Sequence, residues 1–196
     1  HADEINQAAN AVTELRDTGK GPDGSLALFP HLPYLLEENV LISEEEKNAL
    51  LSLKEKAKSY DAVISIGIGG SYLGNQVLFD LFCGPYWNQL TKDERNGYPQ
   101  FYFAGQNVDP VSLTELSSCI SREAKRLMDR RMRVLFLVIS KSGTTIEPVT
   151  AVRGLKKLLA DVCDIHLMAI TDKEKGRIRP VAEKEHFPCF TVPDGI

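Results

Sequence analysis

The sequence predicts an α/β fold, a three-layer sandwich with a five-stranded parallel sheet and an N-terminal helical extension. Strand-like and helix-like segments alternate five times over residues 60–196, which is typical of parallel sheets covered by helices on both faces. The best-defined strand segments are continuous apolar runs, as expected of strands buried on both faces. Two of these runs end in loops of unusual composition. We expect the strand order 2-1-3-4-5, which makes the first and third strands neighbours at the switch point where such sheets bind ligands.

The first 59 residues are expected to form the helical extension. Residues 3–18 have the apolar spacing of a helix, and Gly19 follows as a typical C-cap. Ser43-Glu44-Glu45-Glu46 is a capping box that opens a second helix, to about residue 59. The residues expected to face inward are Ile5, Ala8, Ala9, Val12 and Leu15 in the first helix and Leu50, Leu53 and Ala57 in the second.

The remaining chain, residues 60–196, is expected to form the α/β domain. The predicted strands are residues 62–66, 101–104, 134–139, 167–170 and 190–192. The predicted helices are residues 71–83, 110–129, 145–160 and 176–185. In the helix over 110–129, the residues expected to face inward are Leu113, Leu116, Ile120 and Leu127.

The third predicted strand runs directly into Ser140-Lys141-Ser142-Gly143-Thr144-Thr145 and then into a helix through Glu147. Such a joint directs backbone N–H groups, the positive end of a helix dipole, several hydroxyls and one ammonium group at a small volume. That volume should hold an anion, most simply a phosphate. The alternative is a polar turn that only caps the helix.

The first predicted strand ends in Gly67-Ile68-Gly69-Gly70-Ser71-Tyr72-Leu73-Gly74, where three glycines in four residues let the backbone approach a ligand closely. A dinucleotide site needs Gly-x-Gly-x-x-Gly and an acidic residue after the second strand. Tyr72 stands at the third glycine position and Gly105 follows the second strand, which disfavours that site. No stretch has the pattern of a nucleotide P-loop. Tight packing without a ligand remains an alternative, but both loops together suit a small polyol that carries a phosphate.

Composition narrows the class of partner. The net charge of −4 argues against nucleic acid and acidic membranes, and no apolar run approaches the roughly 18 residues of a membrane span. The four cysteines, Cys83, Cys119, Cys163 and Cys189, form no Cys-x-x-Cys pair. They are expected to be small core residues in a reducing compartment, rather than disulfides or metal ligands.

These loops resemble two signatures of the glucose-6-phosphate isomerase family: Ser65–Gly74, and Ser140–Thr145 with Glu147 in the bacterial form. Tyr102–Gly105 and Val192–Asp194 are similar to further family segments, so the resemblance covers about residues 34–196. It implies a SIS (sugar isomerase) fold, here the N-terminal one of two. It also implies reversible conversion of glucose 6-phosphate and fructose 6-phosphate in glycolysis and gluconeogenesis, without a cofactor. The full-length enzyme is expected to be a cytoplasmic homodimer.

The resemblance also implies roles for individual residues. The residues expected to hold the phosphate are Ser140, Lys141, Ser142 and Thr145, and those expected to contact the sugar are Gly70 and Ser71. Thr144 is expected to support the loop, and Glu147 to contact residues of the site rather than the substrate.

Catalytic residues are expected to be missing. The isomerisation needs ring opening and a carboxylate that moves a proton between adjacent carbons through an enediolate. In the family, the residues for these steps follow beyond the position of Ile196, and none here matches them. We therefore expect a fragment of a longer enzyme, with little or no isomerase activity of its own.

Two rival functions use the same fold. A SIS domain of a sugar-phosphate-sensing regulator would usually bring a nucleic-acid-binding segment, and the N-terminal helices are neither basic nor a helix-turn-helix. Another sugar-phosphate isomerase remains possible, although the Gly-Ile-Gly-Gly-Ser form of the first loop favours the glucose-phosphate family. A scaffold role explains neither loop.

Overall fold

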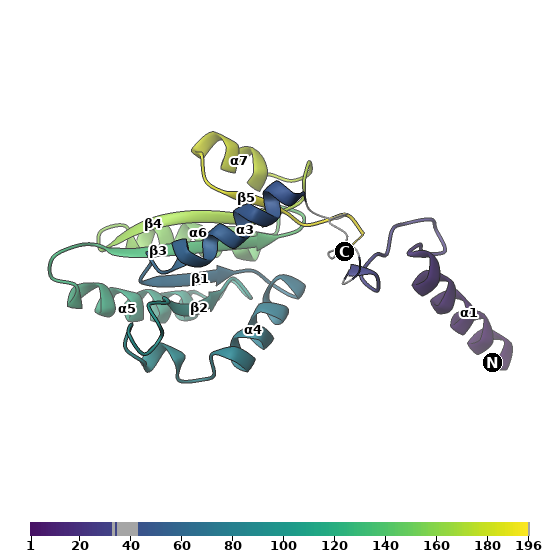
Figure 1. Cartoon of the computed structure of the whole chain (residues 1–196), viewed down its shortest axis with the longest axis horizontal. Coiled ribbons are helices and arrows are strands. Elements are labelled where there is room, and N and C mark those ends of the chain that lie inside the picture. The colour runs from purple at the N-terminus through teal and green to yellow at the C-terminus, as the bar shows by residue number, and fades with distance from the viewer. Residues whose placement is uncertain (33, 35–42, 196) are drawn as a thin grey trace. The chain divides into compact units, whose positions relative to one another are not determined.

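The computed structural model describes residues 1–32, 34 and 43–195. Contacts divide the chain into two compact units, residues 1–50 with 191–196, and residues 51–190. The second unit contains nearly all of the parallel sheet (Figure 1).

In the first unit, α1 (Ala2–Thr18) ends at Gly19 as predicted. Gly19 has the left-handed φ of 66°, and its N–H donates to the carbonyl of Leu15 at 2.8 Å. The prediction of an inward face is wrong for this helix, since Ile5 and Val12 are exposed and no residue of α1 is buried. Periodicity identified the helix, but the described part of its unit leaves this face uncovered.

The predicted capping box is half realised at the start of α3 (Glu44–Ala57). Ser43 Oγ accepts the N–H of Glu46 at 3.1 Å, as the motif requires. The Glu46 carboxylate accepts the N–H of Thr191 at 2.9 Å, and so connects this helix to the last strand. Further along α3, Leu53 packs against the sheet as predicted, whereas Leu50 is exposed.

The sheet has the predicted strand order, β2-β1-β3-β4-β5. Its strands are β1 (Ala62–Ile66), β2 (Gln100–Ala104), β3 (Met132–Ser140), β4 (Cys163–Thr171) and β5 (Cys189–Thr191). The pairs of β1 with β2, β1 with β3, and β3 with β4 are parallel. Both β3 and β4 are longer than predicted, because their backbone pairing continues past the apolar centre into residues with polar side chains.

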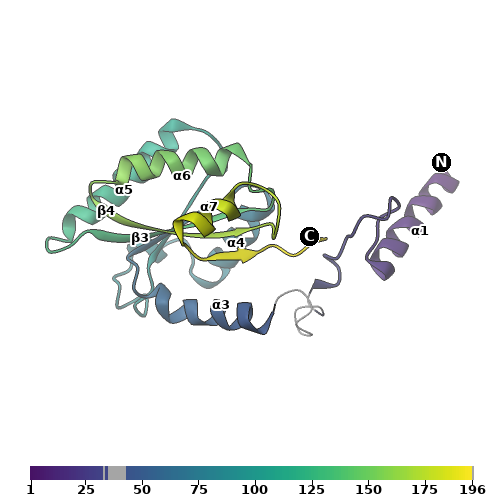
Figure 2. The ribbon, with the colours of Figure 1, turned by 90° about the horizontal axis from the view of Figure 1, so that it is seen from above.

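Helices cover both faces of this sheet, which confirms the three-layer α/β architecture (Figures 1 and 2). The helices are α4 (Gly70–Phe82), α5 (Pro110–Arg126), α6 (Ile146–Leu159) and α7 (Ile178–Glu185), with a short 3-10 helix at Trp87–Gln89. On one face, Ile120 of α5 and Leu155 of α6 pack against Phe136 of the central strand. On the other face, Leu53 of α3 packs against a second apolar cluster. Within the described part of the chain, no helix is both long enough and apolar enough to span a bilayer.

The four cysteines form no disulfide with one another. Cys163 is buried at the start of β4, and burial raises its thiol pKa to about 11. Burial also raises the pKa of Cys83. Among the described residues, no group of three or more His, Cys, Asp or Glu side chains is arranged to hold a metal ion.

Candidate functional site

The two loops singled out in the sequence lie at the same edge of the sheet. We call residues 67–74 the glycine loop and residues 140–145 the hydroxyl loop. Ile66 pairs with Val138, so both loops leave the carboxyl ends of adjacent strands within two residues of each other. Each leads into a helix, α4 or α6, whose first-turn N–H groups have no partner within the helix. The strand order reverses here, so this is the position where open parallel sheets bind ligands.

The side chains of the hydroxyl loop contact one another. Thr145 Oγ1 lies 3.1 Å from Ser140 Oγ and 3.2 Å from Ser142 Oγ. Thr144 Oγ1 donates to Ser142 Oγ at 3.2 Å, and the Thr144 N–H approaches the same oxygen at 3.3 Å. Thr145 is the N-cap residue of α6, but its side chain makes no capping hydrogen bond. The hydroxyl of Thr145 is therefore used within the cluster and not to cap the helix.

This cluster retains donor capacity for a ligand. Its four hydroxyls, from Ser140, Ser142, Thr144 and Thr145, carry one proton each. The three contacts between them use three of those protons, so at least one O–H can donate to an added acceptor. An anion at this position would also face the N-terminus of α6, where the helix dipole favours negative charge.

The hydroxyl loop is held by the segment that follows β4. The N–H of Asp172 donates to the carbonyl of Lys141 at 3.1 Å, and the N–H of Arg177 donates to the carbonyl of Gly143 at 3.2 Å. Gly143 has φ 64°, and a Cβ there would lie 3.2 Å from Thr171 Oγ1 and from the Arg177 nitrogen. A Cβ on Gly176 would overlap the Ser142 carbonyl. The two segments therefore pack backbone to backbone, and this packing fixes the shape of the loop.

The remaining predicted residues of this loop are placed as follows. Ser140 is buried and is the last residue of β3, one residue further into the sheet than the sequence predicted. Lys141 is exposed, and Glu147 is half-buried in the first turn of α6, where a negative charge is favoured by the helix dipole.

Asp172 also lies near this edge, but its carboxylate serves the local turn. Its Oδ1 accepts the N–H groups of Glu174 at 2.8 Å and Lys175 at 2.7 Å. The N–H of Lys175 and then that of Glu174 are the main reasons that the pKa of Asp172 lies below its ordinary value. These hydrogen bonds account for the acidic residue at this strand end, so its presence does not require a catalytic role.

The fold requires a glycine at some positions of the glycine loop and not at others. A Cβ on Gly67 would lie 2.6 Å from the carbonyl oxygen of Ser71, so close packing of the first turn of α4 requires this glycine. Gly69 has φ 58° and is the N-cap of α4. Gly70 begins the helix, and no described atom lies within 4 Å of the position of its Cβ. The fold therefore explains Gly67 and Gly69, whereas Gly70 leaves open space beside the half-buried Ser71.

Gly105 connects three elements at this edge. It follows β2 with φ 83°, and a Cβ there would lie 2.9 Å from Ile66 Cγ2 and 3.3 Å from Pro148 Cα. The end of β2, the end of β1 and the first turn of α6 are therefore in direct contact. This packing holds the starts of the glycine loop and of α6 close together.

The opposite, amino edge of the sheet carries a network around Asp61, whose side chain is only 10% exposed. Arg130 donates to both carboxylate oxygens of Asp61, at 2.6 and 2.7 Å, and the N–H of Arg133 donates to one of them at 2.9 Å. Lys92 Nζ lies 3.7 Å away. Burial alone would raise the pKa of Asp61, but these donors and charges outweigh it and hold the pKa below its ordinary value.

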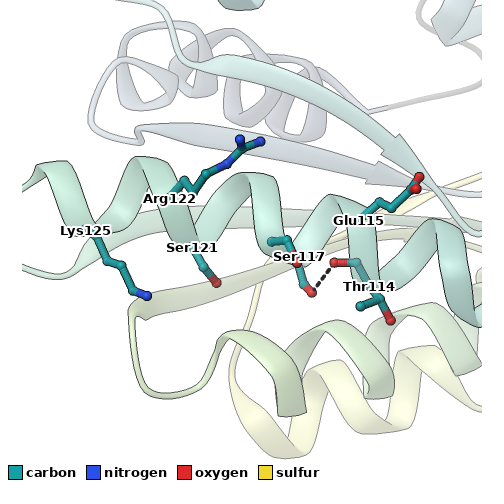
Figure 3. A pocket seen from close by; sticks show the side chains of 7 residues that line it. Thr114, Glu115, Ser117, Ser121, Arg122 and Lys125 are labelled. Carbon is teal, nitrogen blue, oxygen red and sulfur yellow. Dashed lines mark hydrogen bonds between the residues drawn. The ribbon is translucent and has the colours of Figure 1, made fainter.

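A hollow of about 750 Å³ lies along α5, and its lining residues all belong to that helix and to neither loop (Figure 3). Hydroxyl side chains, Arg122 and Lys125 line it. Thr114 Oγ1 donates to the carbonyl of Pro110 at 2.7 Å, and Ser117 Oγ donates to the carbonyl of Thr114 at 2.9 Å. Two of the hydroxyls that line the hollow are therefore already bonded to carbonyls of their own helix.

The strand order and the two loops at the switch point define the class: an open parallel α/β domain with a candidate ligand site at the carboxyl edge of its sheet. No family model matches the chain. Curated relatives do match it. Glucose-6-phosphate isomerase of Fusobacterium nucleatum subsp. nucleatum is 33% identical over 99% of this chain and 42% of its own length. That of Acetivibrio thermocellus is 37% identical over 78% of this chain and 33% of its own length. The chain thus belongs to the glucose-6-phosphate isomerase family, as the loops indicated, and spans about two fifths of the length of its first matched relatives.

A solved structure supports the fold independently. The crystal structure of a hypothetical protein from Thermus thermophilus superposes with a TM-score of 0.62 at 24% identity. The match covers all of this chain and 41% of that protein. At this identity the likeness establishes the architecture, and the function has to be argued from the site.

Proposed function

We propose that this chain is the phosphate-binding part of a glucose-6-phosphate isomerase, which interconverts glucose 6-phosphate and fructose 6-phosphate. The observation that carries the proposal is the hydroxyl cluster at the N-terminus of α6, with at least one O–H left to donate. The relatives named glucose-6-phosphate isomerase support the choice of sugar phosphate. In this proposal residues 1–59 are an N-terminal helical extension and residues 60–196 the sugar-phosphate-binding domain of a cytoplasmic homodimer.

Each residue of the site has a distinct task in this proposal. Ser140, Ser142 and Thr145 hold the phosphate through their hydroxyl network, which has at least one O–H left to donate to it, and Lys141 adds a compact positive charge. Gly70 and Ser71 contact the sugar, because the missing side chain at Gly70 leaves room beside the first turn of α4. Thr144 supports the loop through Ser142. Glu147 lies behind the phosphate site in the first turn of α6 and contacts protein rather than substrate.

We also propose that the isolated chain has little or no isomerase activity. Proton transfer between adjacent carbons needs a carboxylate within reach of the substrate. In the described carboxyl edge, Asp172 is bonded to its own turn, and no other residue is assigned as the base. The chain would therefore bind the substrate's phosphate, while the acid–base residues come from further along the full enzyme.

Binding measurements test this function directly. Glucose 6-phosphate is titrated into the wild-type chain and Lys141→Ala by calorimetry, with glucose and inorganic phosphate as comparison ligands. Loss of one charge-assisted interaction is expected to lower affinity by at least about tenfold. Lys157→Ala, which removes an exposed lysine from the last turn of the same helix, is the control and should bind as the wild type does.

Two results would contradict the proposal. Equal affinity in Lys141→Ala and Lys157→Ala would show that the phosphate does not bind at the hydroxyl loop. Full isomerase turnover by the purified chain would show that a base lies within these 196 residues. Ser142→Ala provides a second test, because it removes a hydroxyl that contacts both Thr144 and Thr145 without changing the charge.

A further inference from the structure

Thr171, the last residue of β4, carries a buried hydroxyl. Its side chain is fully buried, and among the described residues no hydrogen-bond partner lies within reach of Oγ1. A buried hydroxyl without a partner has lost its hydration without compensation, which destabilises the fold. Such a group invites a functional explanation.

The position of Thr171 supplies that explanation. It is the register partner of Ser140, whose side chain belongs to the hydroxyl cluster. Paired residues of adjacent parallel strands point their side chains to the same face of the sheet. Thr171 Oγ1 also faces Gly143 at close range, because a Cβ on that glycine would lie only 3.2 Å away. The unpaired hydroxyl therefore lies directly against the hydroxyl loop.

The direction of the hydrogen bonds in the cluster is undetermined without Thr171. Ser140 Oγ and Thr145 Oγ1 lie 3.1 Å apart, and either can donate to the other. If Thr145 donates inward to Ser140, its proton points away from a ligand. If Ser140 donates outward to Thr145, the Thr145 proton becomes available to an acceptor outside the cluster. A donor behind Ser140 would favour the second arrangement.

We propose that Thr171 is a positioning residue of the phosphate site, in which its O–H donates to Ser140 Oγ when an anion is bound. This proposal rests on the phosphate-binding function proposed above. The resulting chain runs from Thr171 to Ser140 to Thr145 and ends on the anion, and each hydrogen bond polarises the next. Thr171 touches no ligand itself. The free energy lost by leaving its hydroxyl unpaired in the empty site is recovered when the site is filled.

Three variants test this role. Thr171→Val keeps the shape of the side chain and removes the hydroxyl, whereas Thr171→Ser keeps the hydroxyl and removes the methyl group. Ser65→Ala is the matched control, because Ser65 on β1 is also buried with an unpaired Oγ, among the described residues. Strand alternation places Ser65 on the opposite face of the sheet, with Val63, away from the hydroxyl cluster.

Affinity and thermal stability are measured together for each variant. Thr171→Val should melt at a temperature a few degrees higher, because it removes an unpaired buried hydroxyl. The same variant should bind glucose 6-phosphate and inorganic phosphate roughly three- to tenfold more weakly. Thr171→Ser should bind within about twofold of the wild type. Ser65→Ala should gain thermal stability and keep its affinity.

Several outcomes would overturn the proposal. A Thr171→Val variant that is more stable and binds as tightly as the wild type would show a merely structural hydroxyl. Normal binding in Thr171→Val together with weakened binding in Thr171→Ser would assign the effect to the packing of the methyl group and not to the hydroxyl. If Thr171→Val does not fold, Thr171→Ser and Thr171→Ala, which differ only by the hydroxyl, give the same comparison. If the wild-type chain binds neither glucose 6-phosphate nor inorganic phosphate, the proposed phosphate site is wrong, and so is the role of Thr171 in it.

Discussion

The two edges of the parallel sheet use polar groups in opposite ways. At the amino edge, both oxygens of Asp61 accept hydrogen bonds, from Arg130 and from the N–H of Arg133. At the carboxyl edge, the hydroxyls of residues 140–145 contact mainly one another, and the hydroxyl of Thr171 beside them has no partner among the described residues. One edge is electrostatically satisfied, and the other retains unused donors.

This difference separates stability from binding. A buried polar group that has all its partners contributes to folding, whereas one without partners destabilises the fold until something pairs with it. The backbone N–H and C=O of Asp61 also pair, with the carbonyl of Arg133 and the N–H of Gln100 at 2.9 Å each. Asp61 therefore joins the segments at the amino ends of three strands. Changes at the amino edge should affect unfolding, and changes at the hydroxyl loop should mainly affect affinity.

The largest expected effect follows from removing the charge of Asp61. Asp61→Asn should destabilise the chain by about 2–3 kcal/mol, because Arg130 and the N–H of Arg133 lose a charged acceptor in a buried position. Urea unfolding measures the change. The control is Asp164→Asn, since Asp164 is 55% exposed and its pairs with Arg133 and His166 should contribute about 0–1 kcal/mol. Equal effects of the two substitutions would show that the amino edge has no special role in stability.

The same carboxylate should make unfolding depend on pH. The pKa of Asp61 is lower in the folded chain than its ordinary value of 3.8, so the folded state binds this proton less readily than the unfolded state does. The stability that Asp61 contributes is present above about pH 4 and is lost as the pH falls through the folded pKa. Unfolding free energies of the wild type and Asp61→Asn should therefore converge in acid. A difference that stays constant from pH 6 to pH 2 would exclude this explanation.

A smaller effect is expected where packing brings the loops together. Gly105→Ala should destabilise the chain by about 1–3 kcal/mol, because φ is 83° and the new methyl group would lie 2.9 Å from Ile66 Cγ2. Gly97→Ala is the matched control, with the same φ of 83° but no atom of the described residues closer than 3.8 Å. The difference between the two unfolding free energies isolates the packing contribution. If Gly97→Ala destabilises the chain as much, backbone strain alone explains Gly105.

Local sequence patterns predicted the fold well, because each strand and helix depends on neighbours in the chain. The apolar run before Ser140 predicted a buried strand, and the alternation of strands and helices predicted a parallel sheet. The expected order 2-1-3-4-5, which places the two loops side by side, is confirmed. The inward face of α1 was predicted wrongly, since periodicity specifies a face and not a partner that covers it. The roles assigned to Gly70, Ser71 and the hydroxyl loop stay predictions.

Long-range pairing could not be read from the sequence. Thr171 appears there only as a hydroxyl at the end of a predicted strand, and its importance follows from its register with Ser140, 31 positions earlier. Asp61 likewise meets Arg130 across 69 positions. In each case the contact depends on the register of the strands and on the paths of the segments that connect them, which the expected strand order does not specify. A hydroxyl at a strand end was the available signal for Thr171, and such residues are common at strand ends for other reasons.

The smallest expected effect concerns the glycines that the fold does not explain. Gly70 and Gly74 both lie in α4 without a left-handed φ, and no described atom lies within 4 Å of either Cβ position. Gly74→Ala should stabilise the chain by about 0.5–1 kcal/mol, because alanine loses less backbone entropy than glycine inside a helix. Gly70→Ala, at the first helical residue, should change stability less.

Binding distinguishes these two glycines. Gly70→Ala should weaken the binding of glucose 6-phosphate but not of inorganic phosphate, because the added methyl group occupies space proposed for the sugar. Gly74→Ala, one helical turn further along α4, should bind both ligands as the wild type does. If Gly70→Ala binds glucose 6-phosphate normally, the open space at Gly70 is not used by the sugar. The carboxyl edge would then bind the phosphate through the hydroxyl loop alone, and its contrast with the amino edge would be confined to one loop.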